Sequence, residues 1–215
     1  MSTSDLTHAR TTLVLHELRA QEGRPLLHLH GLGLRSPETV PDDLASWPGP
    51  VYALDFTGHG SSSVPQGGGY TPEVLIGDVD AAIEHLGGEV TLIGRGLGAY
   101  VALLVAGARP HAVRGAILCD GPGIAGGGPA PGTPQAIRVD PDAPAPPDPW
   151  AVAELSRDVR PPDYAVDFAR LATANAHTPF AIVANARPEW LAAVSEEVGA
   201  HPTSIEDALR AFSTS

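Results

Sequence analysis

Short apolar segments alternate with longer amphipathic ones along most of this chain. Runs of apolar and β-branched residues predict strands over 11–18, 25–30, 51–56, 90–93, 113–119 and 180–183. Helical spacing predicts helices over 37–47, 71–86, 98–109, 149–159, 163–176, 188–194 and 203–212. The segment 98–109 is almost wholly apolar, which indicates a buried helix. This alternation predicts an α/β fold with a mainly parallel, doubly wound sheet and helices on both faces.

The alternation stops over residues 121–149, where glycine and proline dominate. Such a composition cannot supply a regular core element, so we predict a long surface loop or a reduced lid there. Nothing else marks a boundary between domains, and there are no internal repeats. We therefore expect a single domain over residues 1–215, in which a lid is reduced or absent.

Composition excludes several classes of function. The net charge is −12, and the 13 basic residues are all arginines. The absence of lysine excludes a lysine Schiff base, a pyridoxal-phosphate enzyme and a lysine-containing P-loop. The acidic balance argues against nucleic acid as a partner. Abundant alanine, glycine, proline and arginine without lysine indicate a bacterial genome rich in G and C.

The cysteine count and the lack of long apolar segments indicate the compartment of the protein. The single cysteine, Cys119, allows no intramolecular disulfide. Residues 1–10 are polar and lack the apolar region of a signal peptide, and no apolar run reaches the ~18 residues of a membrane span. We expect a cytoplasmic protein that binds a small molecule, with no membrane partner, cofactor or metal. The oligomeric state is left open.

Three glycine-containing turns follow predicted strands. His30-Gly31-Leu32-Gly33 follows the second, and Asp55-Phe-Thr-Gly-His-Gly-Ser61 follows the third. Gly94-Arg95-Gly96-Leu97-Gly98 stands between the strand at 90–93 and the helix at 98–109. In the turn G-x-S-x-G of serine hydrolases, small residues flank a serine nucleophile because the strand-to-helix turn is very tight. Here both flanking glycines are present, and the middle residue is Gly96.

In this order and at these spacings, the three motifs resemble those of the α/β-hydrolase superfamily, over roughly residues 11–120. The resemblance implies an α/β-hydrolase fold. It also implies that Gly96 occupies the nucleophile position, and that His30 and Gly31 belong to the oxyanion loop. The backbone N–H groups of Leu32 and Leu97 would be the oxyanion donors.

The resemblance also points to other site residues. It assigns the family's acid to Asp120, directly after a strand, and its histidine to His201, before the last helix. Arg95, beside the turn, either holds an anionic ligand or points to solvent. Asp120 and His201 have structural alternatives, a turn former and a surface loop residue.

Gly96 leads to our main hypothesis, a hydrolase-like protein that is non-catalytic or binds a small acid or ester in a residual pocket. The turn also resembles that of the N-myc downstream-regulated family, which has the hydrolase fold, lacks this serine and is considered non-enzymatic. The alternative is a hydrolase or lyase in which His201 and Asp120 activate water directly. A minor alternative is a dinucleotide-binding protein, because Gly94–Ala99 followed by Asp120 fits that fingerprint.

Overall fold

The computed structural model describes residues 2–127, 147–174, 180–201 and 203–213. Within them, one seven-stranded sheet has the order β1-β2-β4-β3-β5-β6-β7. The strands are β1 (Ser2–His8), β2 (Thr11–Arg19), β3 (Leu26–Leu29), β4 (Val51–Asp55), β5 (Val90–Arg95), β6 (Val113–Cys119) and β7 (Phe180–Ile182). Strands β3 to β7 run parallel, whereas β2 is antiparallel to both of its neighbours. The predicted mainly parallel sheet is confirmed.

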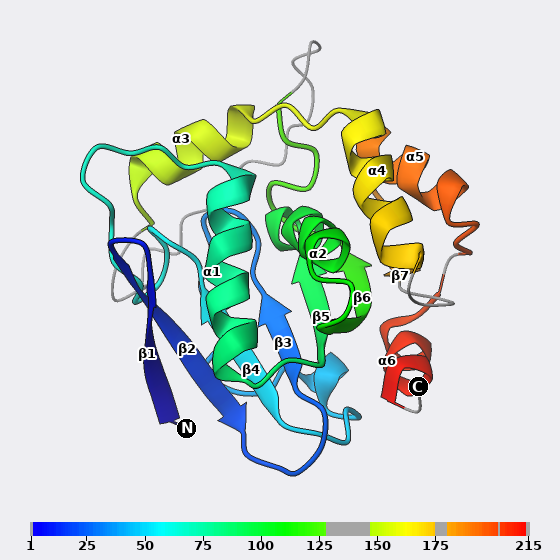
Figure 1. Ribbon diagram of the computed structural model, residues 1–215, viewed down its shortest axis with the longest axis horizontal. Coiled ribbons are helices and arrows are strands. Elements are labelled where there is room, and N and C mark those ends of the chain that lie inside the picture. Colours follow the sequence, from blue (N-terminus) through cyan, green and yellow to red (C-terminus); the bar gives the residue numbers. More distant parts are fainter. Residues whose placement is uncertain (1, 128–146, 175–179, 202, 214–215) are drawn as a thin grey trace.

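Helices cover the two faces of the sheet unequally. One face is covered by α1 (Pro72–His85) and α2 (Leu97–Ala108). Helix α4 (Pro162–Thr173) packs on α2, α5 (Glu189–Glu197) packs on α4, and α3 (Pro149–Arg157) joins this layer. The other face is covered by the 3-10 turn η1 (Asp42–Leu44) and by α6 (Ile205–Ser213). In Figure 1, α1 and α2 lie in front of the sheet, and α3 crosses above the carboxyl ends of the parallel strands. None of the helices in the described ranges is long and apolar enough to cross a membrane.

Helix α2 sits at the centre of the core because its sequence is apolar on every side. All its residues from Leu97 to Gly107 are buried. Two glycines permit this close packing: a Cβ at Gly98 would lie 2.4 Å from the carbonyl oxygen of Leu29, and one at Gly107 would lie 2.5 Å from that of Phe168. The amino end of α2 is thereby held directly against β3 and β5.

Two predicted features differ from the structure. Strand β1 was not expected, because Ser2–His8 is mostly polar. In the structure, only Leu6 of this strand is buried. The predicted helix over 37–47 is wrong: only Asp42–Leu44 forms a 3-10 turn. Pro41 has no N–H to donate to the carbonyl of Pro37, and it disfavours helical backbone at the residue before it. Of the predicted loop or lid at 121–149, residues 128–146 lie outside the described residues.

Candidate functional site

The turn between β5 and α2 carries the backbone geometry of a very sharp strand-to-helix connection. Gly96 has φ 58° and ψ −117°, a conformation that side chains rarely adopt. A Cβ at Gly94 would lie 2.2 Å from the carbonyl oxygen of Gly98, so the strand and the helix approach too closely for a larger residue. The two flanking glycines therefore serve the packing that the sequence predicted for them.

The two amides predicted as oxyanion donors point at one acceptor. The N–H groups of Leu32 and Leu97 both donate to the carbonyl oxygen of Pro122, with N···O distances of 3.0 and 2.9 Å. We call these two donors the Leu32–Leu97 amide pair. Leu97 is the first residue of α2, so the positive end of the helix dipole also faces this oxygen. The carbonyl of Pro122 therefore occupies both of the predicted donors.

Pro122 also fills the space beside the turn. A Cβ at Gly96 would lie 2.1 Å from the Pro122 carbonyl oxygen and 2.5 Å from the carbonyl carbon of Gly121. On the other side, a Cβ at Gly31 would lie 2.9 Å from Cδ of the Pro122 ring. The backbone at 121–122 thus occupies the position that a side chain at residue 96 would need.

The histidines of the first two motifs shape loops. His30 donates through Nδ1 to the carbonyl of Gly31 (2.8 Å) and accepts at Nε2 from the N–H of Phe56 (3.2 Å). His59 likewise donates to the carbonyl of Thr57 (3.1 Å) and accepts from the N–H of Gly33 (3.2 Å). Burial lowers the pKa of His30 to about 4 and that of His59 to about 3. Both rings are neutral connectors between the 30–36 and 55–63 loops.

Asp55 anchors the same loops. Its carboxylate accepts from the N–H of Ser36 (2.7 Å), the N–H of Ser61 (2.8 Å) and Nε2 of His16 (2.9 Å). Burial alone would raise its pKa, but these hydrogen bonds, together with the nearby His30, hold the pKa well below its usual range. Gly60, at φ +54°, is needed because a Cβ there would lie 2.2 Å from the carboxylate.

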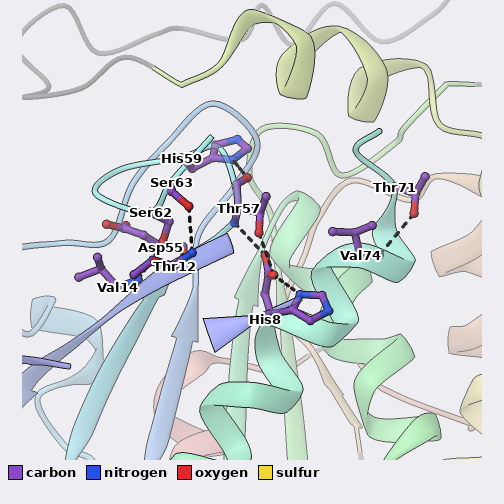
Figure 2. Close-up of polar contacts among 11 residues, drawn as sticks. His8, Thr12, Val14, Asp55, Thr57, His59, Ser62, Ser63, Thr71 and Val74 are labelled. Carbon is purple, nitrogen blue, oxygen red and sulfur yellow. Dashed lines mark hydrogen bonds and ion pairs between the residues drawn. The ribbon is translucent and has the colours of Figure 1, made fainter. Parts of the chain in front are cut away.

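Figure 2 shows the polar contacts that extend this arrangement toward β1, β2 and α1. The hydroxyls of Ser62 and Ser63 accept from the N–H groups of Val14 and Thr12 in β2, each at 2.9 Å. On the other side of the loop, Thr57 donates from its N–H and its hydroxyl to the buried carboxylate of Asp78. His8 also contacts this carboxylate, at 2.8 Å.

The predicted acid and base lie apart in the hydrogen-bond network. The carboxylate of Asp120 accepts from the N–H groups of Asn185 (2.7 Å) and Ala186 (2.9 Å), so it fastens the loop that follows β7. His201 is exposed in the connection between α5 and α6. Over the described ranges, no hydrogen bond or ion pair joins His201 to Asp120. Their predicted catalytic roles remain predictions.

Arg95 is paired with another residue, and Cys119 is buried. The guanidinium of Arg95 forms an ion pair with Asp43 of η1. Cys119 is buried, and this burial raises the pKa of its thiol to about 12, which disfavours the nucleophilic thiolate.

Sequence reasoning did not find Pro122 or the buried Arg160, which contacts the residues after it. Gly121-Pro122-Gly123 has only the pattern of a turn. The sequence does hold one signal for Pro122. Gly31 and Gly96 lack side chains, and this leaves room for another backbone segment to pass beside both of them.

Comparisons with known proteins agree with this geometry. A model of the alpha/beta hydrolase family matches residues 26–212. A probable alcohol acetyltransferase of Wickerhamomyces anomalus is 35% identical over 120 residues, which are 54% of this chain and 34% of that protein. The chain thus spans about a third of the length of this curated relative.

Two solved structures are similar over the whole chain. They are a thioesterase domain from the curacin biosynthetic pathway and a hypothetical protein of Pseudomonas aeruginosa PAO1. Each has a TM-score of 0.66 and 18% identity, covers 100% of this chain, and is itself covered to 98% and 97% respectively. These two show the fold alone. The family model, which covers most of the chain, and the strand-turn-helix geometry at Gly96 establish that this protein belongs to the alpha/beta hydrolase family.

Proposed function

We propose that this chain is a member of the alpha/beta hydrolase family without serine-type hydrolase activity. The observation that carries the proposal is the position of the Pro122 carbonyl, which accepts both hydrogen bonds of the Leu32–Leu97 amide pair. An acyl-transfer enzyme needs these donors free for the oxyanion that develops on the substrate. Gly96 supplies no nucleophile, and no space remains beside it for one.

The proposal is tested with p-nitrophenyl acetate and butyrate, together with labelling by a fluorophosphonate probe. We expect the wild type to hydrolyse both esters at the rate of buffer alone and to stay unlabelled. A hydrolase that has lost only its serine can keep about 10³–10⁴-fold catalysis over water, because its oxyanion hole remains free. Here the amide pair is occupied, so wild-type turnover clearly above the buffer rate would overturn the proposal.

The alternative is a hydrolase in which His201 and Asp120 activate water. It requires the imidazole to approach the carboxylate, and the carboxylate is already held by the backbone of 185–186. If the wild type turns over without being labelled, His201→Ala and Asp120→Asn distinguish the two readings. Loss of turnover in both variants would establish the alternative, whereas unchanged turnover would exclude it.

Gly96→Ser in the same assay tests the steric part of the reasoning. A serine side chain must displace residues 121–122, because its Cβ would lie 2.1 Å from the Pro122 oxygen. We therefore expect Gly96→Ser to stay unlabelled as well, unlike a hydrolase that merely lost its serine. Rapid labelling of this variant would contradict the assignment of the 121–122 backbone as a fixed obstruction.

A further inference from the structure

A buried arginine holds the segment that carries Pro122. Arg160 lies between α3 and α4, and its side chain is fully buried. Its Nη1 donates to the carbonyl oxygens of Gly123 (2.6 Å) and Ile124 (2.7 Å). Trp190 of α5 donates from Nε1 to the same carbonyl of Ile124, at 2.8 Å. The residues directly after Pro122 are thus bound by two side chains from the helical layer.

The environment of Arg160 is poorer in partners than a buried cation usually requires. The guanidinium carbon lies 4.5 Å from the centroid of the Tyr100 ring, and Nε lies 3.7 Å from Oδ2 of Asp158. Nε and Nη2 have no hydrogen-bond partner among the described residues, and neither has that Asp158 oxygen. A buried charge that is only partly compensated destabilises a fold. The favourable contacts that Arg160 does make are the hydrogen bonds to the carbonyls of residues 123–124, so these are its main contribution to the structure.

The segment is tied at a second point beyond the arginine. Gly127 forms a parallel bridge with Val159, and its N–H donates to the carbonyl of Asp158 at 2.6 Å. Gly123 has φ +77°, and a Cβ there would lie 2.6 Å from Cβ of Leu32. Residues 121–124 are therefore held against the amide pair by the contacts of Arg160 and Trp190 and by the bridge at Gly127.

We propose that residues 121–124 are a built-in ligand of the Leu32–Leu97 amide pair, and that Arg160 is the positioning residue that keeps them there. We call residues 121–124 the latch. When the latch moves away from the Leu32–Leu97 amide pair, the pair binds a carboxylate oxygen of a small acid. The proposal builds on the proposed function, which needs a filled amide pair. It adds that the filling depends on one buried side chain.

The first test is amide hydrogen exchange followed by NMR on the wild type, Arg160→Met and Arg157→Met. Arg157 is the matched control, because it is exposed at the end of α3. Loss of the latch should speed exchange at Leu32 and Leu97 about tenfold, which is what one lost hydrogen bond is worth. Exchange at Leu92 in β5 and all rates in Arg157→Met should stay unchanged. Undisturbed protection of both amides in Arg160→Met would overturn the proposal.

A second variant reaches the same state by a different cause. Gly123→Ala keeps the arginine but places a methyl group against Leu32, so it should release the same two amides. If Arg160→Met loses protection throughout the sheet, because the core is damaged, Gly123→Ala and the charge-preserving Arg160→Lys decide the outcome. The proposal requires selective release in Gly123→Ala and partial recovery in Arg160→Lys. Their absence contradicts it.

Sodium acetate is the probe for the released site, with sodium chloride at equal ionic strength as control. In Arg160→Met and Gly123→Ala, acetate should shift the Leu32 and Leu97 amide resonances in a saturable way. The wild type should not respond at the same concentrations. Released amides that ignore acetate would refute the carboxylate site. The ester assay stays separate: wild-type turnover would overturn the proposed function, whereas failed release or binding overturns only this inference.

Discussion

A Cβ at residue 96 provides the sharpest test of how this site is built. In Gly96→Ala the methyl group would lie 2.1 Å from the Pro122 oxygen and 2.5 Å from the carbonyl carbon of Gly121. Both neighbours are backbone atoms, so no side-chain rotation relieves the contact. Residue 96 also keeps φ 58° and ψ −117°, unless the start of α2 changes. The variant must therefore strain its backbone, move residues 121–122, or do both.

The magnitude can be estimated from these contacts. A non-glycine residue in such a conformation costs about 1–3 kcal/mol, and an overpacked core costs about 1–3 kcal/mol. Moving Pro122 breaks its two hydrogen bonds to the amide pair, each worth about 0.5–1.5 kcal/mol. These effects share one displacement and do not simply add, so we expect a loss of about 3–6 kcal/mol. That is a large part of the ~5–15 kcal/mol by which a domain is stable.

The assay is urea unfolding, followed by circular dichroism, of the wild type, Gly96→Ala and Gly199→Ala. Gly199 is the matched control, because it has φ +62° and nothing within 4 Å of an added Cβ. Its variant should lose only about 1 kcal/mol from the left-handed backbone. If Gly96→Ala is no less stable than Gly199→Ala, the 121–122 backbone yields freely, and the steric argument is refuted.

Three further predictions concern Asp55, the three buried histidines and the cap of the first helix. Asp55→Asn removes the charge that three donors converge on and should reduce the free energy of unfolding by about 2–4 kcal/mol in urea; a loss below about 0.5 kcal/mol, as at an ordinary surface site, would contradict this. Burial lowers the pKa values of His28, His30 and His59 to about 4, 4 and 3, below the ordinary histidine value of about 6.5. The unfolded chain therefore binds more protons below pH 6.5, and stability should fall with pH by about 2 kcal/mol per histidine at pH 5. Denaturant midpoints from pH 8 to 5 measure this fall, and His28→Leu should remove about one third of it; an equal pH dependence in that variant would refute the assignment. Thr71→Ala removes the side chain that caps α1 at Val74 and should lower the unfolding free energy by about 1 kcal/mol, unlike Thr3→Ala on the exposed strand β1; equal stability of the two variants would show that this cap contributes nothing.

The sequence predicted the parallel core of the sheet and most helices because their apolar periodicity is strong. It missed β1, whose polar residues pair with β2 through backbone hydrogen bonds that leave little trace in hydrophobicity. It also predicted a helix at 37–47 where only the 3-10 turn Asp42–Leu44 forms, because Pro41 lacks the N–H that a helix needs. The periodicity of apolar residues indicates which positions are buried. The structure of 2–8 and of 37–47 depends instead on which backbone N–H groups can form hydrogen bonds.

The candidate site divides in the same way. Leu32 and Leu97 could be located because motif spacing fixes backbone amides whatever side chains follow. Their occupant could not, because Pro122 reaches them only through the path that the chain takes after β6. Asp120 was identified by its place after a strand, but its partners at 185–186 depend on β7 lying beside β6. Arg160 belongs to no motif, and only its burial draws attention to it.

The unequal covering of the two sheet faces has a consequence for synthesis of the protein. The face opposite α2 relies on α6, whose Ala208, Leu209 and Phe212 pack with residues as early as Leu26. The carbonyl of Phe212 also accepts a hydrogen bond from Arg24, 188 positions earlier. While the chain emerges from the ribosome, the part of this face that α6 covers stays exposed until residues 205–213 have been made. During that interval the nascent protein is most exposed to aggregation and depends most on chaperones.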